Sequence, residues 1–175
     1  MADEYSVLFD AETVQKRVSE LAARISADYA GHRLLCLVVL RGGFFFGADL
    51  VRQIQGVEIE LDFVKMQSYV GRQTSGRIKA AGPLPRVSGY DVLVIEDLVD
   101  TGLTLAELHE ALLAQGPQSL RYAIVVDKKA HRKIEFECEY VAFDVKADDF
   151  LVGYGMDDNN KGRTLPYIGK VIGRP

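Results

Sequence analysis

The stretch of residues 91–105 constrains the fold more than any other part of this 175-residue chain. It opens with residues 92–95, an apolar run rich in β-branched side chains and bounded by polar residues. A run of this length and composition predicts a strand that is buried on both faces of a sheet. Glu96 and Asp97 follow the run, then small and polar turn residues, then leucines at helical spacing. The chain is therefore expected to contain a strand, a short turn and a helix in direct succession.

A strand, a short turn and a helix start place free backbone N–H groups at the carboxyl edge of a sheet, where a phosphate can bind. Thr101 and Thr104 add hydroxyl donors, and Gly102 allows a close approach of the backbone. Carboxylates accept hydrogen bonds, so Glu96 and Asp97 suit sugar hydroxyls or a hydrated divalent metal. Together these features predict a sugar-phosphate site. The alternative is that the two acids are solvated charges and that the helix merely has a good cap, a capping box starting at Thr104.

The segments around this stretch predict an α/β fold. In chain order, the expected elements are a helix over residues 10–30, a strand at 34–40, a helix ending near 54, and strands at 57–66 and 120–126. Strands that alternate with helices predict a mostly parallel, twisted sheet with helices on both faces. Shorter strands near 140–145, 150–154 and 167–172 are expected to form edge hairpins or a small hood over the carboxyl-terminal edge. Since no repeat or linker is visible, residues 1–175 are expected to form a single domain.

The composition argues against several classes of protein. With 48% hydrophobic and 26% charged residues and a net charge of -4, the chain is typical of a globular protein and has no basic surplus for nucleic acid or an anionic membrane. No apolar run is long enough to span a bilayer, and the acidic N-terminus has no apolar signal core. Cys36 and Cys138 lack metal-site spacing and are expected to be buried, reduced thiols. These features predict a cytoplasmic location.

Two segments carry specific motifs. Residues 94–104 read Val-Ile-Glu-Asp-Leu-Val-Asp-Thr-Gly-Leu-Thr, and residues 150–157 read Phe-Leu-Val-Gly-Tyr-Gly-Met-Asp. The first resembles the phosphoribosyl pyrophosphate signature of the purine phosphoribosyltransferases, with the closest similarity to the bacterial hypoxanthine-guanine type. The second resembles the base-binding segment of the same family. The resemblance covers about residues 8–172 and implies a type I phosphoribosyltransferase fold.

The resemblance implies a purine salvage reaction, in which hypoxanthine or guanine reacts with phosphoribosyl pyrophosphate to give IMP or GMP and pyrophosphate. Asp100 would be the general base or acid at the purine imidazole nitrogen. The turn that follows it would hold the 5′-phosphate, through Thr101, Gly102, Leu103 and Thr104. Glu96 and Asp97 would hold the ribose hydroxyls, directly or through the shell of a Mg²⁺ ion that Asp157 also binds.

A second glycine turn, residues 41–43, follows the strand expected at 34–40. Its glycines expose backbone N–H groups and Arg41 supplies a cation, so Arg41 and Gly42 could bind a pyrophosphate group. A plain strand-to-helix turn is the alternative. In relatives this turn binds pyrophosphate, often with a non-proline cis peptide before the first glycine and with Lys in place of Arg41, which would keep the cation but change the geometry.

Residues 67–89 form a long segment with little apolar periodicity, which in a compact domain is usually functional or disordered. Ser68 and Tyr69 resemble the Ser-Tyr pair of the family's mobile lid, expected here over about residues 67–82. Such a lid would exclude water from a cation-like ribosyl centre. The alternative is a disordered surface segment.

The base-binding roles rest on the resemblance. Lys128, at a strand end, would donate to the oxygen at the purine 6-position, although a lysine in a basic run is more often a solvated charge. Phe150 would stack on the purine, with core packing as the alternative. The backbone of Leu151 would contact the base, and Arg163 would bind pyrophosphate.

Three rival functions remain open from the sequence. A xanthine-preferring transferase would use the same residues, because a lysine and a backbone carbonyl sense only the edge of the base. A phosphoribosyltransferase-like regulator that binds nucleic acid conflicts with the acidic composition. A phosphoacceptor receiver domain would not need the Asp-Thr-Gly-x-Thr turn. In addition, no nucleotide-binding P-loop occurs, which argues against a nucleoside triphosphatase. Relatives form dimers or tetramers, so a homodimer or homotetramer is expected.

Overall fold

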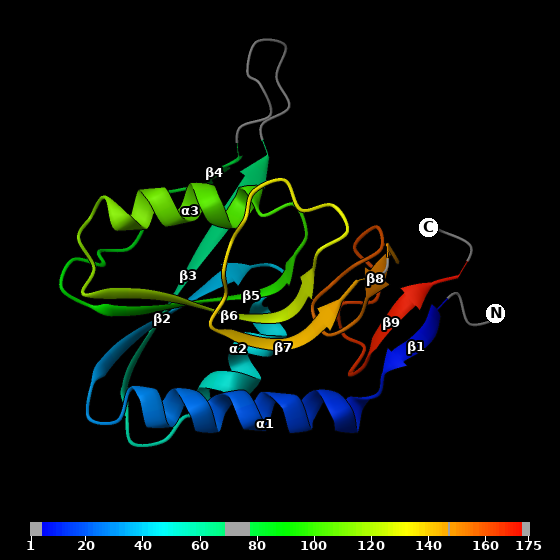
Figure 1. Cartoon of the computed structure of the whole chain (residues 1–175), viewed down its shortest axis with the longest axis horizontal. Helices are drawn as coiled ribbons and strands as arrows, with labels where there is room; N and C mark the ends of the chain where they lie inside the picture. The colour runs from blue at the N-terminus through cyan, green and yellow to red at the C-terminus, as the bar shows by residue number, and fades with distance from the viewer. Residues whose placement is uncertain (1–4, 69–77, 147, 173–175) are drawn as a thin grey trace, which may run out of the picture.

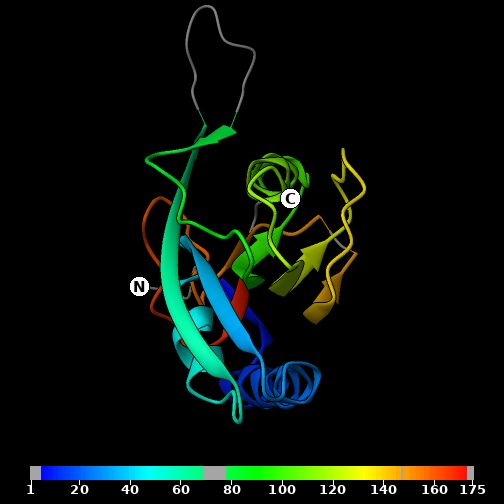
Figure 2. The same cartoon turned by 90° about the vertical axis from the view of Figure 1, so that its left-hand side faces the viewer.

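The described residues, 5–68, 78–146 and 148–172, form two β-sheets and three helices in this computed structural model (Figure 1). The larger sheet has the strand order β4-β3-β2-β5-β6-β7. Its strands are β2 (Arg33–Leu40), β3 (Glu58–Ser68), β4 (Ile78–Ala80), β5 (Asp91–Val99), β6 (Ser119–Lys128) and β7 (Tyr140–Val145). Only β4 runs antiparallel to its neighbour, so the predicted mostly parallel sheet is confirmed. Figure 2 shows the twist of this sheet and the length of β3.

The three helices cover both faces of the sheet, as predicted. They are α1 (Ala11–Asp28), α2 (Phe44–Val51) and α3 (Leu103–Leu113). Alternate side chains of β5 face opposite layers: Leu93 and Ile95 pack in the core with α1 and α2, whereas Val92 and Val94 pack in the core under α3. Burial on both faces explains why these strands read as continuous apolar runs.

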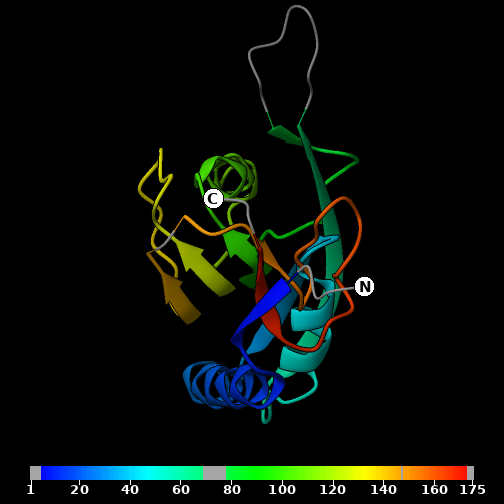
Figure 3. The same ribbon diagram turned by 90° about the vertical axis from the view of Figure 1, so that its right-hand side faces the viewer.

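The predicted hood is a small antiparallel sheet with the order β1-β9-β8. Its strands are β1 (Tyr5–Phe9), β8 (Leu151–Val152) and β9 (Ile168–Val171). Figure 3 shows this sheet from the side on which both ends of the described chain meet. The sequence reading missed β1, a short strand with no fully buried side chain, which is held by its pairing with β9.

Two local expectations around β5 are wrong. The strand does not end before the acids: it continues to Val99, and pairing with β6 holds Glu96 opposite Ile124 and Leu98 opposite Val126. The capping box is also absent, because α3 begins at Leu103 with Gly102 as its N-cap and no side chain caps it. By contrast, the carboxylate of Asp10 caps α1 by accepting a hydrogen bond from the Thr13 N–H at 2.8 Å.

Part of the predicted lid is regular structure. Gln67 and Ser68 end β3, where they pair with β4. Tyr69 and the rest of residues 69–77 lie outside the described residues, so the lid stays a prediction. No helix in the described part of the chain is both long and apolar enough to cross a membrane.

Candidate active site

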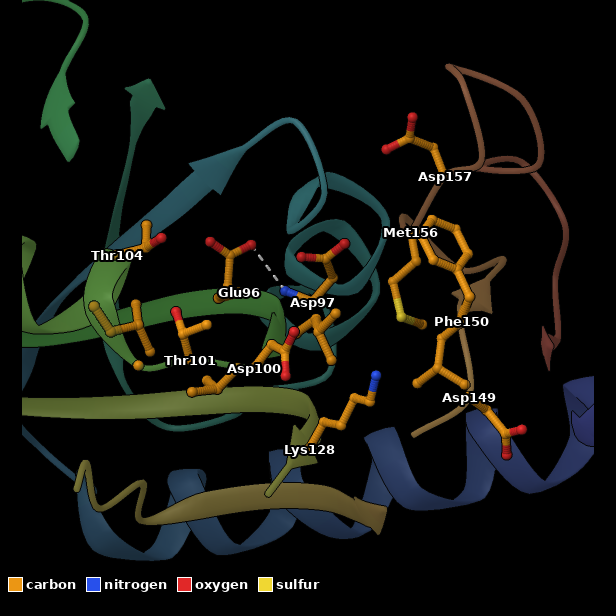
Figure 4. Close-up of a pocket in the computed structure, with 15 residues that line it drawn as sticks. Glu96, Asp97, Asp100, Thr101, Thr104, Lys128, Asp149, Phe150, Met156 and Asp157 are labelled. Carbon is orange, nitrogen blue, oxygen red and sulfur yellow. Dashed lines mark hydrogen bonds between the residues drawn. The ribbon is translucent and has the colours of Figure 1, made fainter. Parts of the chain in front are cut away.

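A cavity of about 320 Å³ opens at the carboxyl ends of β5 and β6. Three parts of the chain form it: the end of β5 with the turn that follows, the last residue of β6, and the segment before and after β8 (Figure 4). The predicted site residues that line it are Glu96, Asp97, Asp100, Thr101, Gly102, Thr104, Lys128, Phe150, Leu151 and Asp157. Residues far apart in the sequence therefore meet where parallel strands end, which is the usual binding edge of such sheets.

Residues 100–104, here called the Asp100 turn, join β5 to α3. Gly102 has φ +81°, a left-handed conformation that favours glycine, and it is the N-cap of α3. No side chain caps α3 from its N-cap, and the Leu103 N–H makes a long hydrogen bond of 3.4 Å to Oγ1 of Thr101, so the other N–H groups of the first turn are available to an anion. Thr101 and Thr104 line the same wall of the cavity. The turn can therefore bind a phosphate through backbone and hydroxyl donors.

The Asp100 carboxylate has one atom, Oδ1, that is buried without a hydrogen-bond partner. The His131 Nδ1 atom lies 3.7 Å from it, which is too far for a hydrogen bond. The Asp100 side chain as a whole is 37% exposed and lines the cavity, so its carboxylate can accept a proton from a bound molecule.

Glu96 and Asp97 form an acidic pair in the wall of the cavity. Glu96 is buried, and its Oε1 atom accepts a hydrogen bond from the Asp97 N–H at 3.0 Å. Burial raises the pKa of Glu96 well above its ordinary value, and the charge of Asp97 raises it further. Burial also raises the pKa of Asp97, although the hydrogen bond with Glu96 and the charge of Arg163 oppose this rise. Two adjacent acids, of which Glu96 is buried and Asp97 half-buried, favour a cation or hydroxyl donors as their partner.

Lys128 is the last residue of β6, and its side chain is 9% exposed. Its ammonium group donates a hydrogen bond to Oδ1 of Asp148 at 3.1 Å, which orients it at the cavity. A lysine held in this way is not the solvated charge that the basic run would suggest. It can donate a proton or a hydrogen bond to an oxygen of a bound molecule.

Residues 41–43, here called the Arg41 turn, lie against the acidic pair. A Cβ atom added to Gly42 would lie 2.1 Å from Oδ2 of Asp97, so only glycine fits. Arg41 is exposed, and its Nη1 donates to Oδ1 of Asn160 at 3.2 Å. The chain has a cis peptide at Leu40–Arg41, one residue earlier than the peptide before the first glycine. Arg41 and Gly42 therefore adjoin the cavity beyond its acidic wall instead of lining it.

The segment from Phe150 to Asp157 forms the opposite wall of the cavity. Phe150 has 39% of its surface exposed and lies at the cavity, so the alternative of core packing is wrong. The Asp157 carboxylate forms an ion pair with Arg163 and accepts a hydrogen bond from the Asn160 N–H at 2.7 Å. Arg163 also donates to the Gly155 carbonyl at 2.6 Å, and it does not line the cavity itself.

The sequence reading missed several residues of this site. Asp149 and Met156 line the cavity, and Asp148 binds Lys128. Asp148 and Asp149 directly precede Phe150, so their place beside the base-binding motif was a signal that could have found them. Among the described residues, no three His, Cys, Asp or Glu side chains gather into a metal-binding group.

Comparison with known proteins gives one consistent result. Residues 4–159 match the family described as "Phosphoribosyl transferase domain". The chain belongs to the phosphoribosyltransferase family. It is 39% identical to the hypoxanthine-guanine phosphoribosyltransferase of Aquifex aeolicus over 93% of this chain and 92% of that protein. It is 37% identical to the hypoxanthine phosphoribosyltransferase of Escherichia coli over 95% and 94%, respectively.

Solved structures of this family have the same fold. A hypoxanthine-guanine phosphoribosyltransferase from Bacillus anthracis superposes with a TM-score of 0.86 at 36% identity, covering 95% of this chain and 97% of that chain. Apart from Arg163, every predicted site residue lies inside the segment that matches the phosphoribosyltransferase family. The cavity at the ends of β5 and β6 is thus the candidate active site of a phosphoribosyltransferase.

Proposed function

We propose that this phosphoribosyltransferase acts in purine salvage, transferring the 5-phosphoribosyl group of phosphoribosyl pyrophosphate to hypoxanthine or guanine. One observation carries the proposal: a helix-start phosphate turn, a carboxylate with an unpaired oxygen, a buried lysine and an exposed aromatic ring all face one cavity. Relatives that are 37–39% identical over nearly the whole chain are named for this activity. The products would be IMP or GMP and pyrophosphate.

The 5′-phosphate is assigned to the Asp100 turn. Thr101 and Thr104 would donate from their hydroxyl groups, and the N–H groups of Gly102 and Leu103 from the helix start. The Leu103 N–H would exchange its long hydrogen bond to Oγ1 of Thr101 for one to the phosphate. Leu103 has a role only through its backbone, since its side chain is partly exposed and does not line the cavity. A phosphate bound in this way holds the ribose beside the acidic pair, where Glu96 and Asp97 can accept hydrogen bonds from its hydroxyl groups.

The purine is assigned to the wall formed by Lys128 and Phe150. The Phe150 ring offers an apolar face for stacking. Lys128, oriented by Asp148, would donate to the oxygen at the purine 6-position. The backbone of Leu151 would contact the edge of the base. Because an ammonium group is only a donor, this wall should reject adenine, whose 6-position carries a donor as well.

The proton transfer is assigned to Asp100. As the bond from the ribose C1 to the purine nitrogen forms, the base must lose the proton of its imidazole ring. The Asp100 carboxylate lines the cavity and its side chain is 37% exposed, so an oxygen of this group can take the proton. In the reverse direction the same group returns it.

A Mg²⁺ ion fits the donor set of the site. Mg²⁺ is usually bound by one or two carboxylates together with substrate phosphates and water, and Asp157 with the acidic pair supplies carboxylates on two walls of the cavity. When bound, the ion would neutralise charge on the departing pyrophosphate. Glu96 and Asp97 would hold it directly or through water. Arg41, the backbone of Gly42 and Arg163 would bind the pyrophosphate itself.

Self-association is part of the proposal. Leu61 and Phe63 of β3 are 48% and 43% exposed, and their register partners in β2 face the α1–α2 layer. Phe44, at the start of α2 in that layer, is 48% exposed. In the described part of the chain, β4 covers only the end of the outer edge of β3. An apolar surface beside an open edge is suited to a second copy of this chain. The cytoplasmic location stays a prediction.

The proposed function is tested by a product assay with phosphoribosyl pyrophosphate, Mg²⁺ and one base at a time. Hypoxanthine and guanine should each give the nucleoside monophosphate and pyrophosphate, while adenine should give none. A clear preference for xanthine would support the xanthine-specific rival. Absence of product with all three oxopurines would contradict the proposed function.

A further inference from the structure

Arg132 follows β6 and has a buried guanidinium group with four partners; its side chain is 8% exposed. It forms an ion pair with Asp127, which is also buried. Its Nε donates to the Asp100 carbonyl at 3.0 Å and its Nη1 to the Phe136 carbonyl at 3.2 Å. Nη2 also reaches the Lys128 carbonyl at 3.5 Å. One side chain therefore links the strand end that carries Lys128 to the Asp100 turn.

The backbone after Arg132 contacts the same turn. The N–H groups of Lys133 and Ile134 donate to the Thr101 carbonyl at 3.0 and 3.2 Å. A Cβ atom added to Gly102 would lie 2.6 Å from the Ile134 carbonyl oxygen and 3.3 Å from Cδ of Arg132. Residues 132–134, here called the brace, thus lie directly against the back of the Asp100 turn.

These contacts decide which way the peptides of the turn face. In a trans peptide the carbonyl and the following N–H point in opposite directions. The brace holds the carbonyls of Asp100 and Thr101, so the N–H groups of Thr101 and Gly102 must point away from the brace. The opposite side of the turn is the cavity, which Thr101 and Gly102 line.

We propose that Arg132 is a positioning residue, which orients the Asp100 turn for the 5′-phosphate without touching the substrate. This role rests on the proposed function of the turn. Arg132 is suited to it because it binds the backbone carbonyl of Asp100 and forms no hydrogen bond with the carboxylate, whose Oδ1 atom keeps no hydrogen-bond partner. Its charge is balanced by Asp127, so the pair can stay buried behind the phosphate site.

The test compares two probes that occupy different parts of the site. Inosine 5′-monophosphate carries the 5′-phosphate, whereas inorganic pyrophosphate with Mg²⁺ belongs to the Arg41 turn. In Arg132→Gln, the affinity for the monophosphate should fall about tenfold or more, which corresponds to about 1.4 kcal/mol. The affinity for pyrophosphate should stay within about twofold of the wild-type value. Binding is measured by calorimetry at a temperature where thermal unfolding confirms that each variant is folded.

Two further variants separate positioning from stability. Arg17 also holds two carbonyls, those of Val141 and Ala142, but far from the cavity, so Arg17→Gln is the matched control. It should lower the melting temperature without changing either affinity. Arg132→Lys keeps a charge for Asp127 but cannot replace the planar group that reaches several carbonyls. It should fold even if Arg132→Gln does not, and it should still bind the monophosphate more weakly than the wild type.

The outcomes distinguish this inference from the proposed function. If the folded Arg132 variants bind both probes like the wild type, or if both probes weaken equally, Arg132 is only a stabilising residue and the inference is wrong. A monophosphate defect in Arg17→Gln would also overturn it. Lack of transferase activity in the wild type would instead overturn the proposed function, since the binding measurements do not depend on turnover.

Discussion

The Arg41 turn and the Asp100 turn both lead from a parallel strand through glycine into a helix, yet opposite charges lie behind them. The Asp100 turn is backed by the guanidinium group of Arg132 and by backbone donors that hold its carbonyls. Behind the Arg41 turn lies the carboxylate of Asp97, which a Cβ atom on Gly42 would overlap. The first turn is an anion site that is already oriented, whereas the second has negative charge at its back.

The difference suggests two modes of binding. An anion that approaches the Arg41 turn is repelled by the acidic pair until a cation reduces that repulsion. The Asp100 turn needs no such cation, because N–H groups oriented by the brace are part of the fold. We therefore expect pyrophosphate to need Mg²⁺ and the 5′-phosphate to bind without it.

Removal of Mg²⁺ should have the largest effect. Excess EDTA should abolish turnover, because the acidic pair would then oppose the pyrophosphate group. The melting temperature should not change, since the described residues contain no metal-binding group of three side chains. Product formation is followed before chelation, after it, and after Mg²⁺ is restored. Full turnover in EDTA would show that the two turns do not differ in their need for a cation.

Replacement of Asp100 should have the next largest effect. Asp100→Asn keeps the shape of the side chain but removes the basic oxygen, so kcat should fall about 10²–10⁴-fold. Affinity for phosphoribosyl pyrophosphate should be unchanged or slightly higher, because one negative charge beside the phosphate is removed. Steady-state kinetics and equilibrium binding together test this. Near-normal kcat with reduced affinity would make Asp100 a structural residue of its turn.

The acidic pair should leave a signature in the pH dependence of stability. The pKa of Glu96 is raised in the folded state, so the folded protein holds this proton where the unfolded chain has lost it. The contribution of Glu96 therefore becomes less favourable as the pH rises above its ordinary pKa of 4.5. Glu96→Gln removes this penalty and should be more stable than the wild type at pH 7.

The gain from Glu96→Gln should shrink as the pH falls toward 4, where Glu96 is protonated in both states. Denaturant unfolding of both proteins across this range measures it. A constant difference at all pH values would mean that burial does not raise the pKa of Glu96.

The smallest expected effect concerns Arg41. Its side chain is exposed and contacts only Asn160 among the described residues, so Arg41→Lys should change the affinity for pyrophosphate less than about fivefold, the range of an exposed charged contact. Arg41→Gln, which removes the cation, should weaken it more. Equal effects of the two substitutions would show that the geometry of the guanidinium group matters and not its charge.

Much of the fold could be predicted because both faces of the sheet are buried. The runs that became β2, β5 and β6 are continuous and apolar, and short turns join them to helices, which leaves few arrangements other than a parallel sheet. The site residues in residues 94–104 and 150–157 could be predicted because they follow one another in specific motifs.

The remaining features depend on contacts between distant residues. Glu96 and Asp97 lie in a strand because pairing with β6 continues past the apolar run, and local charge alone predicts a turn. Arg132 belongs to a basic run that resembles a solvated surface, and only its partners Asp100 and Asp127 show that it is buried. Spacing along the chain contains no signal for such contacts.

The contrast between the two turns is tested most directly by binding in two glycine variants. Gly102→Ala should weaken the binding of inosine 5′-monophosphate, because alanine is strained at φ +81° and its Cβ atom would clash with Ile134. It should leave the binding of pyrophosphate with Mg²⁺ unaffected. Gly42→Ala should weaken the binding of pyrophosphate with Mg²⁺ more than that of the monophosphate, because its Cβ atom would displace Asp97, which the monophosphate meets only through its ribose. Calorimetry of both probes on both folded variants gives four affinities. Opposite losses in the two variants are the predicted result, and equal losses of both probes in both variants would contradict separate phosphate and pyrophosphate turns.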